Sequence, residues 1–259
     1  MADPVLVSRD GAIATVTLNN PARLNALNRT MWAALGDIMR SLSRDESLRC
    51  VVLRGAGEKA FAAGADISEF ATERADSAQA REYGALIHET MQAVARCAHP
   101  TVAMIHGACV GGGLEIAAMC DMRICGESSR FGIPINRLGL TMAYGELQGL
   151  LALVGRAVAL EILLEGRVFD AQEALHKRLV NRVVPDARVE EEAYALARRI
   201  ADGAPLVARW HKKFIDRLTV TAEPSAAEWD EGFACFDTED YRTGVEAFLR
   251  KEKPRFRGR

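Results

Sequence analysis

The spacing of apolar residues along the first 130 positions predicts short buried strands that alternate with helices. Residues 5–8 and 13–18 are rich in β-branched side chains and flank Asp10-Gly11, a favoured turn pair, so they predict a hairpin. Apolar residues recur at helical spacing over 29–44, directly after Asn28, which can cap a helix. Because strands and helices alternate, the predicted fold class is α/β. Further buried strands are expected at 50–53, 101–105 and 122–125, and further helices at 76–97 and 112–119.

The pattern changes after about residue 145. Strand signals nearly vanish there, except at 180–184, and helical periodicity dominates the rest of the chain. The helical stretches run over 146–176, 189–218 and 222–250. We therefore predict an α/β core over residues 1–200 and a helical C-terminal region over residues 201–259.

The amino-acid composition limits the classes of protein to which this chain can belong. The chain has 259 residues, of which 49% are hydrophobic and 26% charged, which is ordinary for a globular protein and excludes a disordered or fibrous one. A net charge of −2 provides no global basic field, so a nucleic-acid partner is not expected. The last ten residues are the exception, with six basic side chains and one acidic. Tails of this kind are usually solvated, but this one has a second interpretation below.

Targeting and metal signals are weak in this sequence. The first ten residues, MADPVLVSRD, carry acidic residues where a signal peptide would be basic. The most apolar stretch, 149–164, contains Arg156 and Glu161 and is shorter than the ~20 residues of a membrane span. The six cysteines form no CxxC pair, and the five histidines show no metal-ligand spacing. We therefore expect a cytoplasmic protein with reduced thiols, without a membrane span or a zinc site.

Two glycine-rich turns each follow a buried strand, and both could present backbone N–H groups to a ligand. The first is AAGADI at 62–67 and the second is GGGLE at 111–115, which opens a helix. Two facing turns of this kind could direct two N–H donors at one oxygen and stabilise a developing oxyanion. Neither turn is a nucleotide-binding fingerprint. The alternative is that both are simply tight loops, because periodicity alone does not show whether they meet.

The sequence resembles the crotonase superfamily, the enoyl-CoA hydratases and isomerases. The motifs that carry this resemblance span nearly the whole chain, in order and at the expected spacings. They are NNPARLNALN (19–28), KAFAAGADISEF (59–70), HGACVGGGLEIAAMCDMRI (106–124), SSRFGIPINRLGL (128–140), LLEGRVFDAQEALHKRLVNRVV (163–184) and TEDYRTGVEAFLRKEKPRFRG (238–258). The resemblance implies a spiral of β-β-α units with a helical C-terminal region for oligomerisation. It also implies a homotrimer or a dimer of trimers, and a coenzyme A thioester as substrate.

Each functional position of the family can be carried over to a matching residue. The thioester oxygen would lie between the backbone N–H groups of Ala65 and Gly112, and coenzyme A would run along Ala63, Ala65, Asp66 and Ile67. Arg23 matches the region that reaches toward the coenzyme A phosphates. The basic tail, with Lys251, Lys253 and Phe256, resembles a segment that closes over the coenzyme A of a neighbouring subunit. A basic tail facing phosphates is electrostatically favourable, although these cations could equally be solvated surface.

Glu115 is the expected acid/base, because it lies one turn after Gly112 on the helix that supplies a donor. Burial would raise the pKa of its carboxyl group and favour proton exchange with an α-carbon. The structural alternative is a carboxylate that simply stabilises the start of a helix.

The sequence departs from the family at a second acidic position. Hydratases of this family usually carry a glutamate directly after the proline of FGxP, where this chain has Ile135, and the next residue, Asn136, is not an acid either. Two-carboxylate hydration is therefore in doubt. Tyr144 and Glu146 are candidates to compensate, or else they form a helix cap or a pocket wall.

Two residues near the second turn are not expected to act as nucleophiles. His106 and Cys109 stand between the strand and the turn, and the sequence offers no partner triad for either. We expect both to be packing residues.

The resulting prediction is an acyl-CoA enzyme of the enoyl-CoA hydratase/isomerase type, with one glutamate as acid/base and substrate contacts that include Ile135 and Tyr144. No separate cofactor is expected, because coenzyme A is part of the substrate. The alternatives are a one-carboxylate isomerase, decarboxylase or thioester hydrolase of the same fold, or a non-catalytic acyl-CoA-binding protein.

Overall fold

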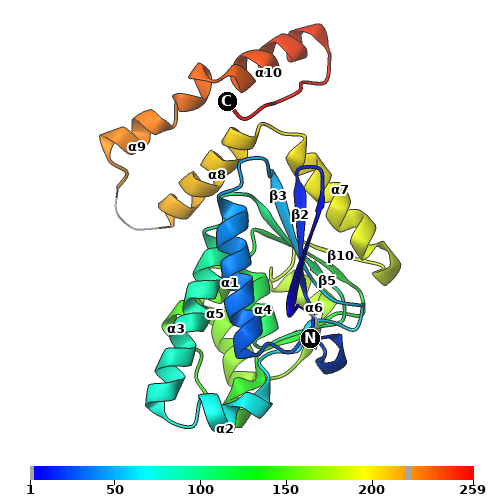
Figure 1. Ribbon diagram of the computed structural model, residues 1–259, viewed down its shortest axis with the longest axis vertical. Helices are drawn as coiled ribbons and strands as arrows, with labels where there is room; N and C mark the ends of the chain where they lie inside the picture. The colour runs from blue at the N-terminus through cyan, green and yellow to red at the C-terminus, as the bar shows by residue number, and fades with distance from the viewer. Residues whose placement is uncertain (1–2, 220–222) are drawn as a thin grey trace.

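Two β-sheets form the centre of the protein (Figure 1). The computed structural model describes residues 3–219 and 223–259. The larger sheet has the strand order β1-β2-β3-β5-β7-β10, and the smaller has the order β4-β6-β8-β9. The strands of the large sheet are β1 Val5–Asp10, β2 Ile13–Leu18, β3 Cys50–Gly55, β5 Thr101–Ile105, β7 Met122–Gly126 and β10 Arg182–Val184. Those of the small sheet are β4 Ala60–Ala62, β6 Ala108–Val110, β8 Arg130–Gly132 and β9 Phe169–Asp170.

The chain winds through these sheets as a repeated β-β-α unit. It passes from β3 to β4 and α3 (Ser77–Ala95), then from β5 to β6 and α4 (Gly112–Met119), then from β7 to β8 and α5 (Tyr144–Glu165). The strands β3, β5 and β7 pair in parallel, as do β4, β6 and β8. This is the spiral of β-β-α units that the family resemblance implies.

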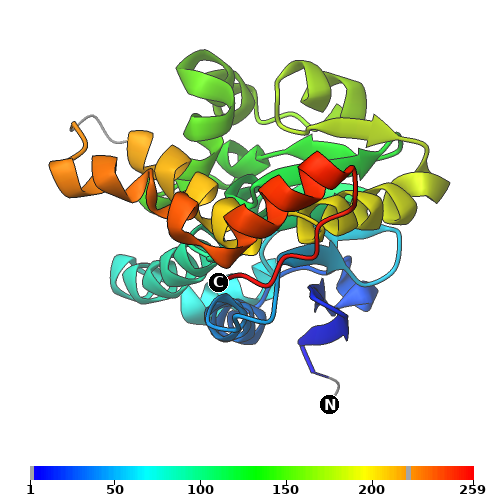
Figure 2. The same ribbon diagram turned by 90° about the horizontal axis from the view of Figure 1, so that it is seen from above.

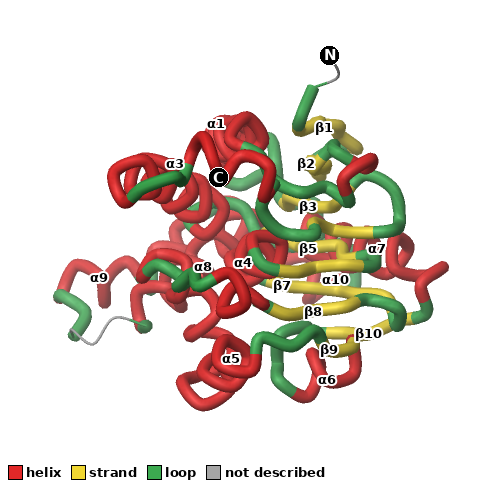
Figure 3. Tube along the Cα trace, turned by 90° about the horizontal axis from the view of Figure 1, so that it is seen from below, coloured by secondary structure: helices red, strands yellow, loops and turns green. Residues whose placement is uncertain are grey.

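Helices cover both faces of the large sheet (Figure 3). On one face, α1 (Arg29–Ser43), α3 and α4 enclose the main hydrophobic core, and Asn28 caps α1 through the N–H of Met31, as predicted. On the other face, α7 (Val189–Ala201) packs on a second core that includes Val52 and Met104. Because both faces are buried, the central strands are continuous apolar runs rather than alternating ones.

The short strands of the small sheet were not predicted. The strands β4, β6 and β8 are three residues long, and β9 has two, which is too short for a periodic pattern. The predicted hairpin is confirmed, but its turn is displaced by one residue: Asp10 pairs with Ile13, so the turn occupies Gly11 and Ala12, with Gly11 at φ +56°.

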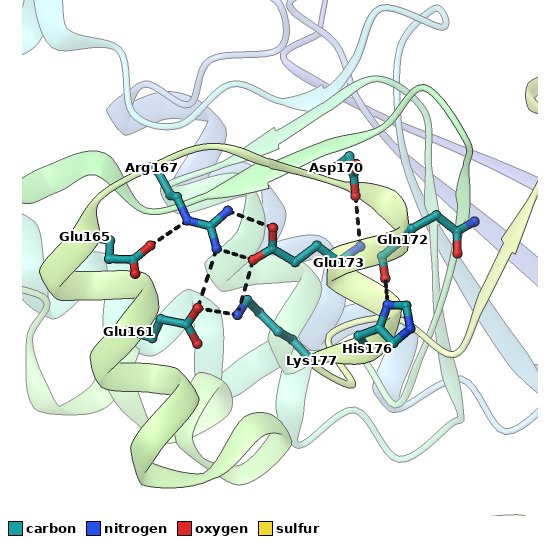
Figure 4. A network of polar contacts seen from close by, with 8 residues as sticks. All are labelled: Glu161, Glu165, Arg167, Asp170, Gln172, Glu173, His176 and Lys177. Atoms are coloured by element: carbon teal, nitrogen blue, oxygen red, sulfur yellow. Dashed lines mark hydrogen bonds and ion pairs between the residues drawn. The ribbon is translucent and has the colours of Figure 1, made fainter.

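The helical stretch predicted over 146–176 is two helices. α5 ends at Gly166, which adopts a left-handed conformation (φ +55°), and the chain then forms β9 before α6 (Ala171–His176) begins. Asp170 caps α6 by accepting from the N–H of Glu173 at 2.8 Å. A network of ion pairs holds the end of α5 to α6 (Figure 4). Its contacts include those of Arg167 with Glu173 and of Lys177 with Glu161.

The predicted helix over 189–218 is likewise divided. α7 ends at Ala201, and α8 (Pro205–Leu218) begins with a proline, which disfavours helical geometry in the residue before it. The stretch predicted over 222–250 consists of α9 (Ala226–Glu231), a 3-10 turn and α10 (Glu239–Arg250), and residue 222 lies outside the described residues. The division into residues 1–200 and 201–259 stays a prediction.

The basic tail runs back along α10 (Figure 2). The carboxylate of Asp240, near the start of α10, accepts from the backbone N–H groups of Arg257 and Gly258 at 2.7 and 2.8 Å. In Figure 1, α10 and the tail lie at one end of the long axis and α2 (Phe70–Glu73) lies at the other.

By length and composition alone, α5 could cross a membrane. It has 22 residues, and its most apolar window has a mean hydropathy of 1.8, so the expected absence of a membrane span stays a prediction. The helix is interrupted, however, because Gly155 in its middle has the non-helical angles φ 69° and ψ 174°. It also packs against α3 and α4. We therefore interpret α5 as a helix of the globular unit.

Candidate active site

A cavity of about 460 Å³ lies where the two glycine-rich turns meet α1, α2, α3 and the start of α5. Its size is in the range of small-molecule sites. The charged side chains in its wall are those of Arg74, Glu115 and Glu146. The remaining lining residues are Trp32, Ala63, Gly64, Ala65, Ile67, Phe70, Ala80, Gly84, Ile87, Val110, Gly111, Gly112, Pro134, Ile135, Leu138, Gly139, Leu140, Thr141 and Ala143.

The two turns touch one another at their glycines. A Cβ atom built on Gly64 would lie 3.4 Å from the carbonyl oxygen of Val110 and 3.9 Å from the backbone nitrogen of Gly112. Gly64 and Gly111 have φ values of +109° and +50°, which side-chain-bearing residues rarely adopt. The structure thus brings together two segments that are separated by almost fifty residues in the sequence.

Each turn leaves one backbone N–H group in the cavity wall that has no partner in the part of the chain that the structure describes. Ala63 and Asp66 donate to the carbonyl oxygens of Leu24 and Leu27, at 3.0 and 2.8 Å. Ala65, between them, donates to no acceptor among the residues that the structure describes. Gly112 is the first residue of α4, and its N–H is likewise unpaired within the described chain, because a helix cannot satisfy its first N–H groups internally. The wall therefore offers two hydrogen-bond donors, one of them at the positive end of a helix dipole.

Glu115 lies buried one turn into α4. Gly113 allows α4 to approach β4 closely, since a Cβ atom at this position would lie 2.2 Å from the carbonyl oxygen of Ala62. The Glu115 side chain lines the cavity and makes no hydrogen bond with any described residue, and Glu115 is only 8% exposed. Burial, followed by the negative charge of Glu146, raises its pKa to about 8. It is therefore largely protonated at neutral pH and able to give up that proton.

Tyr144 and Glu146, the two candidates to compensate for Ile135, differ in their position relative to the cavity. Ile135 itself lines the cavity, so the position has access to a ligand but carries no acid. Tyr144 does not line the cavity and is 91% exposed. Glu146 does line it, and its carboxylate also accepts from the N–H of Ala143 at 2.7 Å at the start of α5. The structure therefore keeps Glu146 as a candidate second carboxylate and places Tyr144 outside the cavity.

The same arrangement of motifs occurs in known proteins. A family model described as enoyl-CoA hydratase/isomerase matches residues 8–259. The chain belongs to this family, within the crotonase superfamily.

Relatives that match along their full length support this assignment. A short-chain-enoyl-CoA hydratase from Clostridium acetobutylicum is 35% identical over 96% of this chain and 95% of that protein. A crystal structure of an enoyl-CoA hydratase/carnithine racemase from Magnetospirillum magneticum is 50% identical with a TM-score of 0.98, and the match covers 100% of this chain and 97% of that one. The crystal structure of an enoyl-CoA hydratase from Bacillus anthracis is 32% identical with a TM-score of 0.93. That match covers 99% of this chain and 100% of the other. This enoyl-CoA hydratase/isomerase family member is therefore an acyl-CoA enzyme with the crotonase fold.

Arg23 and Asp66, two of the residues predicted to bind coenzyme A in this family member, contact each other. Arg23 forms an ion pair with Asp66 at 2.6 Å and donates to the hydroxyl of Ser68 at 3.0 Å, beside the cavity rather than in its wall. The Ser68 hydroxyl group lowers the pKa of Asp66. Because the N–H groups of Ala63 and Asp66 are occupied, these two residues can offer a ligand only their carbonyl oxygens and side chains. Ile67 lines the cavity and is 60% exposed, as suits a contact at its mouth.

The basic tail makes no contribution to the cavity of its own chain. Lys253 forms an ion pair with Asp202 at 2.6 Å, and the carbonyl oxygen of Phe256 accepts from Arg49 at 2.5 Å. Lys251 ends α10 in a left-handed conformation. None of these three residues lines the cavity, and a role over a neighbouring subunit stays a prediction.

His106 and Cys109 are outside the cavity wall. Burial lowers the pKa of His106 and raises that of Cys109, so each is favoured in its neutral form. Over residues 3–219 and 223–259, no group of three or more His, Cys, Asp or Glu side chains could hold a metal ion.

Sequence reasoning missed Arg74 and Trp32, which both line the cavity. Arg74 Nε and Nη2 and Trp32 Nε1 are buried and have no hydrogen-bond partner within the described part of the chain. Arg74 follows the four-residue helix α2, where no periodicity marks a buried position, so the sequence held no signal for it. The cavity wall therefore carries unpaired donors as well as the two carboxyl groups.

Proposed function

We propose that this protein hydrates enoyl-CoA thioesters, with the N–H groups of Ala65 and Gly112 binding the thioester oxygen and Glu115 transferring a proton. The observation that carries this proposal is a buried carboxyl group, with its pKa near neutrality, in the same cavity as two unpaired backbone donors. The relatives from Clostridium acetobutylicum and Bacillus anthracis are named as enoyl-CoA hydratases, which supports the reaction type.

In the proposed mechanism, the two N–H groups stabilise the negative charge that the thioester oxygen gains in the transition state. Hydroxide from water adds to the β-carbon while Glu115, protonated, delivers a proton to the α-carbon. A pKa of about 8 suits this role, because the group is protonated at neutral pH and its proton is not held too strongly. The start of α4 adds the favourable field of a helix dipole at the oxygen.

Glu146 is proposed to orient the water and take its proton. It lines the same cavity, and its charge raises the pKa of Glu115, which supports the two carboxyl groups acting on one substrate. After the addition, the proton on Glu146 returns through solvent to Glu115, so that one water has been added in total. Glu146, from the start of α5, would thereby replace the carboxylate that Ile135 lacks.

A double-bond shift is the second candidate, and Ile135 favours it. Isomerisation moves one proton from one carbon of the acyl chain to another, so the single carboxyl group of Glu115 could serve it. The absence of an acid at position 135 removes a group that hydration uses in the family and that isomerisation would not need. The two reactions differ in whether water appears in the product.

The first experiment follows the loss of the enoyl-thioester ultraviolet absorbance of crotonyl-CoA. We expect wild-type protein to hydrate it, Glu115→Gln to lose at least about 100-fold in rate, and Glu146→Gln to lose about 10-fold or more. The exposed Glu89→Gln on α3 is the matched control and should retain full activity. Hydration that is independent of Glu146 would remove that residue from the mechanism.

An inactive wild type would point elsewhere. If it converts a 3-enoyl-CoA to a 2-enoyl-CoA, the isomerase candidate takes over. If it binds CoA esters and Glu115→Gln changes nothing, the protein is a non-catalytic acyl-CoA-binding protein.

A further inference from the structure

Arg74 lines the cavity and carries a positive charge that forms no ion pair with any residue the structure describes. No carboxylate of the described residues lies within ion-pair distance of its guanidinium group, although Glu115 and Glu146 share the cavity wall. Its Nε and Nη2 atoms are buried and have no hydrogen-bond partner over residues 3–219 and 223–259. Arg74 as a whole is half-buried, and a charged donor that is partly removed from water is stabilised when it finds an acceptor.

The nearby acidic residues of α2 and α3 are held by other groups: Asp76 caps α3 by accepting from the backbone N–H groups of Ala78 and Gln79, at 2.8 and 2.9 Å. Arg29 forms ion pairs with Glu73 at 2.9 Å and with Glu82 at 2.5 Å, and its backbone N–H donates to Glu69 at 2.9 Å. Tyr83 also donates to Glu69, at 3.0 Å. These carboxylates are thus committed to other groups, and Arg74 is left for whatever enters the cavity.

Two aromatic rings hold the Arg74 guanidinium group in place. Its Cζ atom lies 4.0 Å from the centroid of the Tyr83 ring and 4.7 Å from that of Phe70. Cation–π contacts at these distances orient a guanidinium group without using its N–H donors. The planar fork of an arginine matches both oxygens of a carboxylate.

We propose that Arg74 binds a carboxylate at the far end of the acyl chain, so that the preferred substrates are thioesters of dicarboxylic acids. The inference rests on the proposed function for the acyl-CoA part of the ligand. The turns at Ala65 and Gly112 hold the thioester, and α2 and α3 form the part of the wall that carries Arg74. An apolar chain of the same length would leave the guanidinium group desolvated and unpaired, which makes it the poorer ligand.

The test compares binding of three unreactive ligands by calorimetry: adipyl-CoA, hexanoyl-CoA and free coenzyme A. Wild-type protein should bind adipyl-CoA about 10- to 100-fold more tightly than hexanoyl-CoA. Arg74→Met should lose that preference, Arg74→Lys should retain part of it, and affinity for free coenzyme A should not change. Arg81→Met, an exposed arginine of α3, is the matched control for the loss of one positive charge.

Several results would overturn the inference. These are a wild-type preference for hexanoyl-CoA, an equal loss of affinity for all three ligands in Arg74→Met, or the same change in Arg81→Met. The wild-type comparison needs no variant, so it stands even if Arg74→Met fails to fold.

Turnover of the matching 2-enoyl thioesters separates this inference from the proposed function. Crotonyl-CoA hydration without an adipyl-CoA preference would remove the dicarboxylate inference alone. An adipyl-CoA preference without turnover of any enoyl thioester would remove the proposed function and leave the Arg74 site standing.

Discussion

At the scale of single residues, the burial of Glu115 in the cavity wall has an electrostatic cost. Glu115 is almost completely buried without a hydrogen bond to the described protein, and its pKa is raised to about 8, first by burial and then by Glu146. Arg74 acts in the opposite direction and lowers it. A group held in this way is suited to proton transfer but reduces stability wherever the unfolded chain would ionise it.

The pH dependence of stability should reveal this cost. Glu115 binds a proton more tightly in the folded state (pKa about 8) than in the unfolded state (pKa 4.5), so its contribution to stability falls as pH rises between these values and is constant above. Glu115→Gln removes this effect. We expect its melting temperature, relative to wild type, to increase from pH 5 to pH 8.5. The control Glu89→Gln should show no such trend, and a flat difference for Glu115→Gln would mean that its pKa is not raised.

At the scale of elements, the close approach of α4 to β4 determines where the donor and the acid lie. A glycine at position 113 makes this approach possible, because any Cβ atom would collide with the carbonyl oxygen of Ala62 at 2.2 Å. The ion pairs of Arg167 with Glu165 and Glu173, at the other end of α5, are partly exposed. They should add little to the stability of the fold, because water screens ion pairs at a surface.

Substituting two glycines by alanine should give opposite effects. Gly113→Ala should lower the free energy of unfolding by about 2–3 kcal/mol, because backbone atoms must move apart to admit the methyl group. Gly84→Ala, inside α3 with no atom within 4 Å of its Cβ position, should raise it by up to about 1 kcal/mol. Urea denaturation measures both. Equal small effects would contradict the close approach of α4 to β4.

At the scale of the whole molecule, the C-terminal helices α8–α10 expose much apolar surface in the single chain. Phe248 is 82% exposed and Leu249 is 76% exposed. Other exposed apolar side chains of this region are Ile215, Leu218, Trp229, Phe233, Phe236 and Val245. Large apolar side chains that are exposed in such number over one region often mark a protein–protein interface. We propose that they serve the trimer or dimer of trimers expected from the family.

Light scattering coupled to gel filtration tests this assembly. We expect a mass of three or six times the 28.2 kDa of one chain, and a lower mass for Phe248→Glu, because a charge cannot be buried unpaired in an interface. The Arg81→Glu variant, on the exposed face of α3, serves as the control and should assemble normally. A wild-type mass of 28.2 kDa would contradict the proposal.

The sequence by itself determined the features that depend on local interactions. Periodicity and capping predicted α1 after Asn28, the central strands and the order of elements, because each depends on residues within a few positions. The motifs also indicated Glu115 and the two turns as the parts of one family site.

Only the tertiary structure decided which distant segments share the cavity. The contact of Gly64 with Gly111, the short strands of the small sheet and the entry of Glu146 and Arg74 into one wall all depend on packing between elements far apart in the chain. The same packing places Tyr144 in solvent, although it is two residues from Glu146. Local periodicity carries no information about such contacts, since they depend on how the spiral of β-β-α units closes on itself.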